Sequence, residues 1–392
     1  MKIVQVHNYY KQPGGESSVV KKEKKLLKHN NNQVLQYTKD NKEIAGIKDY
    51  IQVALNTRYS KKVYKNFKRF LKREFPDIVH IHNFFPLITP SIFDCTIEKN
   101  IPSILTLHNY RLLHPNGLML NDGKVDERSV EGSAYRCVLD RVYRNSIIQT
   151  AVVANMIEYH RKKKTWQTKV DGFIALTEFA KEKFVEGGLP AKKIYVKPNF
   201  VEDPIEKEKA LNFTTDKQGY LFLGRISKEK GIEELIEAWI QDKSLPNLFI
   251  AGDGPLKNDL EKKTLDLSNI NWLGRIPNEK VLGWLKKVKA MIFPSICYEG
   301  FPMTILEAFS VGCPVICSNI GSQQSIIDDE ITGLHFEVGN KEDLLGKVLK
   351  LEQNVNLVNE LGSNAREKYL KEYTPEKNYK MLMNIYSNIS TD

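Results

Sequence analysis

The sequence has few cysteines and no long apolar run, and both absences narrow the class of protein. The five cysteines, at positions 95, 137, 297, 313 and 317, are widely scattered and never form a C-x-x-C pair. A disulfide framework or a zinc site is therefore not expected, and a reducing cytoplasm suits the chain. No apolar stretch reaches the roughly 18 residues of a spanning helix. The apolar run at the N-terminus is also too short for a signal peptide.

Positive charge is in excess, but it is unevenly distributed along the chain. The 58 Lys and Arg outnumber the 48 Asp and Glu, and residues 1–200 carry +16 whereas residues 201–392 carry −6. Charge of this sign favours a nucleic-acid or membrane partner. No helix-turn-helix, finger or aromatic-basic RNA motif is visible, so no nucleic-acid partner is expected. The split indicates two modules with different partners.

The 392 residues are too many for one core, and their pattern predicts two successive α/β domains. Apolar β-branched runs alternate with helical patterns, which is typical of doubly wound parallel sheets. We expect one domain over residues 1–201, a polar linker over 202–218 and a second domain over 219–374. A helix over about 375–392 is expected to pack back on the first domain. Ligands of such folds bind at the carboxyl ends of the strands.

One loop and helix in the second half suggest an anion site. Residues 294–309 (PSICYEGFPMTILEAF) follow an apolar strand, pass through a Gly/Pro turn and open a helix. Free N–H groups at a helix N-terminus bind anions, which makes Phe301, Met303 and Thr304 candidate backbone ligands. Glu299 lies before the helix and Glu307 within it. Spacing alone equally allows both carboxylates to be solvated surface groups.

Two further glycine loops follow strands of the same half. Residues 224–231 (GRISKEKG) place Arg225 and Lys230 where they could clamp a diphosphate. Taken singly, both are more often solvated surface charges. Residues 251–255 (AGDGP) form the other loop, a weak turn signal by itself. Three such loops in one domain converge on a phosphate-rich ligand.

Together these motifs resemble the family 4 retaining glycosyltransferases of the GT-B fold, which consists of two Rossmann-like domains facing across a cleft. The pair Glu299 and Glu307, with seven residues between, resembles the family's E-x7-E motif. The loops at 224–231 and 251–255, the NWLG at 271–274 and Gly321-Ser322 follow in the family's order. The resemblance covers nearly the whole chain.

The resemblance implies a role for each matching residue. Arg225 and Lys230 would hold the donor's diphosphate, Glu307 the ribose and Glu299 the donor sugar. His108 would lie near the acceptor, although a lone histidine at a strand end is more often structural. The implied catalytic set is Glu299, His108, Arg225 and Lys230, with no metal ligand. The implied donor-binding set is Gly15, Glu16, Asn199, Gly224, Arg225, Lys230, Gly252, Gly254, Ile276, Glu299, Gly300, Phe301, Met303, Thr304 and Glu307.

An insert after His108 resembles a bacterial subgroup that serves surface polysaccharides. Its members often carry cysteines in this insert, where this chain has His114, Asp126 and Ser129 and keeps only Cys137. Two ligands, His114 and Cys137, do not make a zinc site, so a metal is not expected.

The resemblance further implies a metal-independent reaction without a cofactor. A nucleotide-diphosphate sugar, with UDP favoured over GDP, would be the co-substrate. The acceptor would be a glycan or a polyprenyl-diphosphate-linked molecule at the inner face of the plasma membrane. No Asp-x-Asp motif of metal-using transferases occurs. A sugar-nucleotide epimerase on the same fold is the alternative, and a basic nucleic-acid-binding protein is a weaker one.

The basic segment at residues 61–73 (KKVYKNFKRFLKR) allows two interpretations. A basic amphipathic helix can lie on an anionic membrane. It can equally pack its apolar stripe on the sheet and leave its lysines in water.

Overall fold

The computed structural model describes residues 1–11, 14–204 and 217–390 and divides into two compact units. The first unit comprises Met1–Asn121, Asp126–Asn199 and Asn378–Asp392, and the second comprises Asp122–Val125 and Phe200–Lys377. Most of the predicted linker, residues 205–216, lies outside the described residues. No described helix has both the length and the apolar character needed to cross a bilayer.

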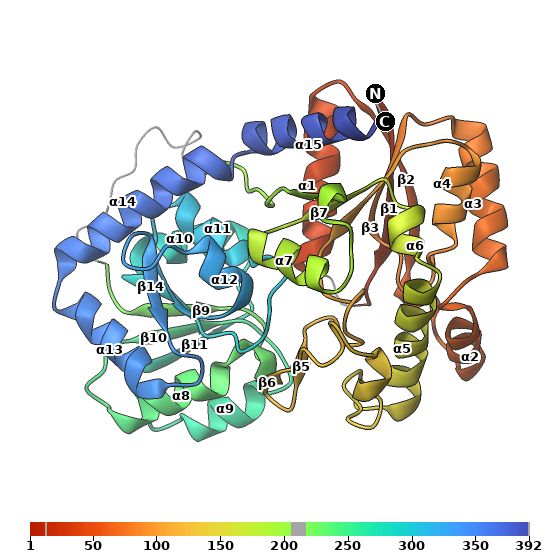
Figure 1. Cartoon of the computed structure of the whole chain (residues 1–392). Helices are drawn as coiled ribbons and strands as arrows, with labels where there is room; N and C mark the ends of the chain where they lie inside the picture. Colours follow the sequence, from red (N-terminus) through yellow and green to blue (C-terminus); the bar gives the residue numbers. More distant parts are fainter. Residues whose placement is uncertain (12–13, 205–216, 391–392) are drawn as a thin grey trace. The chain divides into compact units, whose positions relative to one another are not determined.

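The first unit is built on a six-stranded sheet in the order β2-β1-β3-β4-β7-β8, with every neighbouring pair parallel. Its central strands are apolar and buried on both faces, as a sheet covered by helices requires. Figure 1 shows α1 on one side of this sheet and α3 and α4 on the other. The strands are β1 (Lys2–Tyr9), β2 (Gln33–Asp40), β3 (Ile78–Asn83), β4 (Ser103–Leu107), β7 (Gly172–Ala175) and β8 (Ile194–Val196), with β5 (Leu120–Asn121) and β6 (Lys124–Val125) in the insert after β4.

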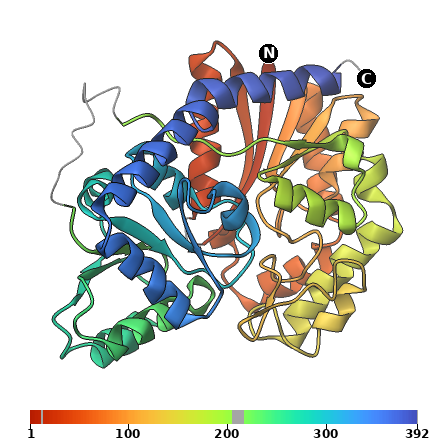
Figure 2. The same cartoon turned by 60° about the vertical axis from the view of Figure 1, so that its left-hand side comes forward.

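The helices of the first unit come from both ends of the sequence. Residues 378–390 of the last helix belong to the first unit, and the helix is the dark blue ribbon near the top of both views (Figures 1 and 2). The Tyr379 hydroxyl accepts a hydrogen bond from Asn32. The helices are α1 (Gly15–His29), α2 (Ile47–Asn56), α3 (Lys61–Glu74), α4 (Ile92–Glu98), α5 (Ile147–Lys162), α6 (Thr165–Thr168), α7 (Glu178–Glu186) and α15 (Pro375–Ser390), with 3-10 turns η1 (Asn41–Glu43), η2 (Ala134–Cys137) and η3 (Ala191–Lys193).

The second unit repeats the design with a parallel sheet in the order β11-β10-β9-β12-β13-β14. Its strands are β9 (Tyr220–Leu223), β10 (Leu248–Ala251), β11 (Ile270–Gly274), β12 (Ala290–Phe293), β13 (Val315–Ser318) and β14 (Gly333–Phe336). Its helices are η4 (Lys228–Lys230), α8 (Ile232–Gln241), α9 (Lys257–Lys263), α10 (Asn278–Lys287), α11 (Met303–Ser310), α12 (Gly321–Ile326), α13 (Lys341–Glu352) and α14 (Val355–Glu372). The predicted pair of doubly wound α/β folds is confirmed.

The basic helix α3 packs inward, so the membrane interpretation is wrong for its apolar face. Val63, Phe67 and Leu71 are buried, and the Phe67 ring meets Tyr37 of β2 edge-on at a centroid distance of 4.8 Å. An apolar stripe that fills the core of its own unit is not available to a bilayer. Only the lysine-rich face of α3 remains in water.

Replacing Phe67 tests this burial. Phe67→Ala should lower the free energy of unfolding of the first unit by about 3 to 5 kcal/mol, because the ring leaves a cavity in the core. Urea unfolding followed by circular dichroism measures the change. Lys65→Ala, on the exposed face of the same helix, should stay within about 0.5 kcal/mol of wild type. Equal effects of the two substitutions would contradict the inward packing of α3.

Candidate active site

Two loops of the second unit are joined at the carboxyl edge of its sheet. They follow the neighbouring strands β9 and β12. The backbone carbonyl of Glu229 accepts hydrogen bonds from the Ser295 hydroxyl at 3.0 Å and from the Ile296 amide at 3.1 Å. The glycine-rich loop and the loop that carries Glu299 therefore form one surface, as the sequence predicts for residues that follow parallel strands.

Two glycines allow these loops to approach so closely. Gly231 has a φ of +63°, and a Cβ there would lie 1.9 Å from the carbonyl oxygen of Pro294. A Cβ on Gly252, after β10, would lie 1.8 Å from the carbonyl oxygen of Gly224. Neither position can hold a side chain unless the backbone moves. The two glycines thus allow neighbouring backbone segments to come into contact at the edge of the sheet where the motif residues lie.

Lys230 and Glu299 form a half-buried ion pair on this surface. The Lys230 Nζ is 2.5 Å from the Glu299 Oε1, and the Ser295 hydroxyl donates to the same oxygen at 2.6 Å. Burial lowers the pKa of Lys230, but the Glu299 carboxylate outweighs burial, and the pKa is raised overall. Lys230 is therefore a cation at neutral pH, and Glu299 is held in one place by two donors.

Arg225 offers a second positive charge from the same loop. Its side chain is exposed and forms no ion pair with any residue in the part of the chain that the structure describes. The carboxylate of Glu307 is half-buried on α11. That helix begins at Met303 after the N-cap residue Pro302, close to the predicted start. An exposed guanidinium, a buried ammonium and a helix N-terminus together favour an anionic ligand.

The other predicted residues of the second unit lie on this edge or support it. Ile276 follows β11, is partly buried and packs against the core, as do Phe301 and Met303. A Cβ on Gly254 would lie 2.3 Å from the backbone carbonyl oxygen of Ile226. Gly300 and Thr304 are half-exposed, beside Glu299 and on α11 respectively.

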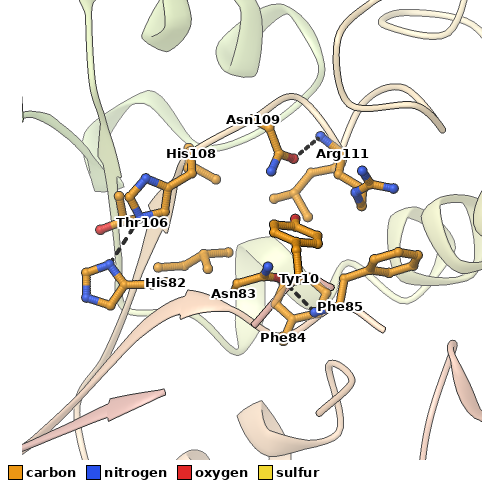
Figure 3. A pocket seen from close by; sticks show the side chains of 12 residues that line it. Tyr10, His82, Asn83, Phe84, Phe85, Thr106, His108, Asn109 and Arg111 are labelled. Carbon is orange, nitrogen blue, oxygen red and sulfur yellow. Dashed lines mark hydrogen bonds between the residues drawn. The ribbon is translucent and has the colours of Figure 1, made fainter. Parts of the chain in front are cut away.

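The first unit has its own small pocket, at the carboxyl ends of β3 and β4 (Figure 3). His108 follows β4 directly, and its Nε2 lies 3.1 Å from the Nδ1 of His82 on β3. The pocket has a volume of about 40 Å³, and the rest of its polar lining consists of Tyr10, Asn83, Thr106, Asn109 and Arg111. The structure therefore places His108 in a polar pocket, which the sequence alone left undecided.

Behind this pocket is a buried carboxylate that the sequence analysis missed. The Glu23 Oε1 of α1 is 3.2 Å from the Nδ1 of His80 and 3.0 Å from the Nε2 of His82. The Lys197 Nζ is 3.7 Å from its other oxygen. Burial raises the pKa of Glu23, but His80 and His82 outweigh it and lower the pKa well below its usual range. The available signal was the spacing of His80 and His82, which places both on one face of a strand.

His108 is a neutral ring that contacts His82. Burial, and then the neighbouring histidines, lower the pKa of His108 well below its usual value, so its ring is neutral at pH 7. A neutral imidazole has one nitrogen that donates a hydrogen bond and one that accepts. His108 can therefore bond His82 with one nitrogen and a ligand with the other.

Three residues of the predicted donor-binding set belong to the first unit. Gly15 and Glu16 form the first turn of α1. The Glu16 Oε1 is 3.7 Å from the Nδ1 of His7, and burial raises the pKa of Glu16 to about 8. Glu16 is therefore largely protonated at neutral pH. Asn199 is buried at the end of its segment.

The insert after His108 gathers more potential metal ligands than its sequence indicates. The Nε2 of His114 is 3.5 Å from both the Cys137 sulfur and the Asp126 Oδ2, and all three residues are buried. Arg128, however, donates to both oxygens of Asp126 at 2.8 Å. The guanidinium already supplies the positive charge that the carboxylate needs, so we describe the group as a hydrogen-bonded cluster.

Comparison with solved structures gives the class of fold. The Anabaena protein HepE, in complex with UDP and glucose, matches with a TM-score of 0.66 at 16% identity over 99% of each chain. A glycosyltransferase from Rickettsia africae matches with a TM-score of 0.70 at 19% identity over 99% of this chain and 98% of its own. At these identities the likeness establishes the predicted GT-B fold.

The family follows from the sequence. The model described as "Glycosyltransferase Family 4" matches residues 35–203, and that of "Glycosyl transferases group 1" matches residues 203–368. The chain therefore belongs to the family 4 glycosyltransferases.

Three curated proteins illustrate its relatives. An uncharacterized glycosyltransferase of Methanocaldococcus jannaschii is 27% identical over 83% of this chain and 80% of its own. The alpha-monoglucosyldiacylglycerol synthase of Acholeplasma laidlawii is 25% identical over 83% and 78%. The UDP-Gal:alpha-D-GlcNAc-diphosphoundecaprenol alpha-1,3-galactosyltransferase of Escherichia coli is 27% identical over 46% of this chain and 48% of its own.

Substitution of Gly231 tests the close approach of the two loops. Gly231→Ala should destabilise the second unit by about 2 to 5 kcal/mol, since the added Cβ requires both a positive φ and displacement of Pro294. Thermal unfolding measures this loss. Gly283→Ala is the control, because the space around that exposed position of α10 is open. It should stabilise the helix by about 0.5 to 1 kcal/mol. A Gly231 variant as stable as wild type would show that the loops tolerate separation.

The buried histidines predict how stability depends on pH. Burial, and then His82, lower the pKa of His80 to about 4. Between about pH 6.5 and pH 4 the unfolded chain binds a proton at this site that the folded chain does not, so acidification favours unfolding. The melting temperature should therefore fall steadily across this range. His80→Gln should flatten the fall, whereas His29→Gln, at an exposed position, should leave it unchanged. A slope unaltered in His80→Gln would contradict this assignment.

Proposed function

We propose that this chain is a retaining glycosyltransferase that moves a sugar from a nucleotide-diphosphate sugar, UDP rather than GDP, to a hydroxyl of a glycan or polyprenyl-diphosphate-linked acceptor. Membership of the family supports the class of reaction. The name of the E. coli relative supports a UDP-sugar and a lipid-diphosphate acceptor, and HepE binds UDP. The name of the A. laidlawii relative supports a glycolipid product and a role at the inner membrane face.

The observation that carries the proposal is the cationic edge of the second unit. Lys230 is paired with Glu299 at 2.5 Å beside Arg225, which has no carboxylate partner among the described residues. Negative charge develops on the departing nucleoside diphosphate, and fixed cations stabilise it where water is excluded. Two side-chain cations and the N-terminus of α11 can fill this role, which favours a metal-independent reaction. Glu307 offers two acceptor oxygens for the ribose hydroxyls.

The setting of Glu299 favours retention without a covalent intermediate. Lys230 and Ser295 both donate to its Oε1, and hydrogen bonds to a carboxylate reduce its nucleophilicity. We assign Glu299 to orienting the donor sugar and supporting positive charge at the reacting carbon. The acceptor hydroxyl would attack on the face that the diphosphate leaves, and a departing phosphate oxygen would take its proton.

His108 is assigned to the acceptor. Its ring is neutral, and the ring nitrogen that does not face His82 can form a hydrogen bond with the attacking hydroxyl and orient it. Glu23 and His82 act through His108 as positioning residues. The alternative, a sugar-nucleotide epimerase on the same fold, would turn over a single substrate without an acceptor. The presence of Arg225 and Lys230 in the same unit as Glu299 and Glu307 favours transfer.

Glu307→Gln tests the donor site. Loss of a carboxylate that takes two ribose hydroxyls should weaken UDP binding at least tenfold, measured by calorimetry, because charged hydrogen bonds are worth about 1.5 to 3 kcal/mol. Glu279→Gln, an exposed carboxyl on α10, is the control and should bind as wild type does. UDP should raise the melting temperature more than GDP or ADP does. Wild-type affinity in Glu307→Gln would refute its ribose role, and indifference to all three nucleotides would refute the donor class.

A further inference from the structure

Helix α2 differs from the other long helices of its unit because none of its residues is buried. Ile47, Ile51 and Leu55 recur every fourth residue and are 80%, 56% and 78% exposed. Residues at this spacing lie on one side of a helix. An amphipathic helix usually turns such a face to the core, as α3 does with Val63 and Phe67. The apolar side of α2 is therefore not packed against the core, although its sequence pattern is typical of a helix that packs there.

Beside this helix lies an apolar groove with a volume of about 290 Å³. Figure 1 shows α2 next to α5, and both helices line the groove. Ile148, at the start of α5, is 76% exposed on its rim. This volume is close to the lower end of small-molecule sites in proteins. The apolar part of the lining comprises Ile44, Ile47, Tyr50, Ile51, Val53, Ala54, Phe85, Pro86, Tyr143, Ile148, Val152 and Val153.

The groove adjoins the pocket of His108. Phe85 lines both, and Figure 3 shows it with Arg111 at one side of the pocket. The Arg111 guanidinium lies 4.5 Å from the centre of the Phe85 ring and 5.1 Å from that of Tyr143, which lines the groove. The apolar groove, the Arg111 cation and the pocket of His108 are therefore neighbours, which would let one molecule contact all three.

The Lys and Arg side chains that line the groove and the pocket are not matched by any acidic lining residue. Lys11 and Arg144 line the groove, Arg111 lines the pocket, and no Asp or Glu of the described residues lines either. Arg144 is exposed and forms no ion pair within the described ranges. The terminal nitrogens of Arg111 donate to the backbone carbonyls of Pro115 and Asn116, and its Nε is buried without a hydrogen-bond partner there. The acidic group near Arg111 is Glu16, and burial raises its pKa to about 8, so it is largely neutral at pH 7. Apolar walls next to cations without a negatively charged partner fit an amphiphile with an anionic head.

We infer that this groove holds the apolar chain of a lipid-diphosphate acceptor. The diphosphate would lie against Lys11, Arg111 and Arg144, and the sugar hydroxyl would reach His108. The inference rests on the proposed function and adds to it a binding site for the lipid. A groove of about 290 Å³ next to the pocket of His108 favours a bound lipid over a flat bilayer surface, which needs no cavity.

The test compares the affinity of the protein for an amphiphile, farnesyl diphosphate, with its affinity for the head group alone, inorganic diphosphate. Farnesyl diphosphate should bind wild-type protein, in the presence of saturating UDP, at least tenfold more tightly than inorganic diphosphate does. Ile51→Glu and Ile148→Glu place a charge in the groove and should each weaken farnesyl diphosphate binding at least tenfold in calorimetry. Leu265→Glu is the matched control: this leucine is 80% exposed in the second unit and should have no effect. Both groove positions are exposed, so the variants should keep the wild-type melting temperature.

Several outcomes would overturn the inference. Equal binding of farnesyl and inorganic diphosphate, or full farnesyl diphosphate binding in both groove variants, would show that the groove holds no lipid chain. If the groove variants instead lose only their binding to phosphatidylglycerol vesicles, the groove contacts the bilayer and not the acceptor. The UDP-induced rise in melting temperature, recorded for every variant, separates these results from a failure of the proposed function. Its absence in wild type would refute the donor, whatever the lipid does.

Discussion

The buried carboxylate of Glu23 is the interaction on which the first unit depends. An isolated charge in a protein interior costs several kcal/mol, so its partners must stay in place. Those partners come from β3 through His80 and His82 and from the segment after β8 through Lys197. His80 also bonds the hydroxyl of Tyr386 on α15 at 2.7 Å. One carboxylate thus ties together parts of the chain that are far apart in sequence, and through His82 it is linked to His108.

The second unit holds its candidate site residues in place by different interactions. Its functional loops meet through backbone groups, and glycines make the approach possible. A single ion pair, Lys230 with Glu299, then fixes the charged groups on that frame. The first unit thus gathers several titratable histidines around one carboxylate, whereas the second unit relies on a backbone frame with a half-buried ion pair.

The sequence predicts the strands and the edge loops well, because both are local signals. Short apolar runs buried on both faces identify the strands, and residues that follow them must gather at one edge. Glu23 could not be found this way, since its partners are up to 174 positions away along the chain, at Lys197. The helices α2 and α3 show the same limit. Their patterns are alike, yet only α3 is buried, because Tyr37 lies opposite it. Periodicity shows that a face is apolar, and the rest of the fold determines what covers it.

The order of the two units along the sequence affects how the protein folds during synthesis. The main segment of the first unit ends at Asn199, and residues 378–390 also belong to this unit. In sequence, the second unit is therefore an insertion within the first. At synthesis rates of 5 to 20 residues per second, roughly 10 to 35 seconds pass between the two segments. Throughout that time His80 lacks the hydroxyl of Tyr386. The second unit, encoded in one continuous stretch apart from four residues, can complete its fold first, and the N-terminal half of the protein is the last to be finished.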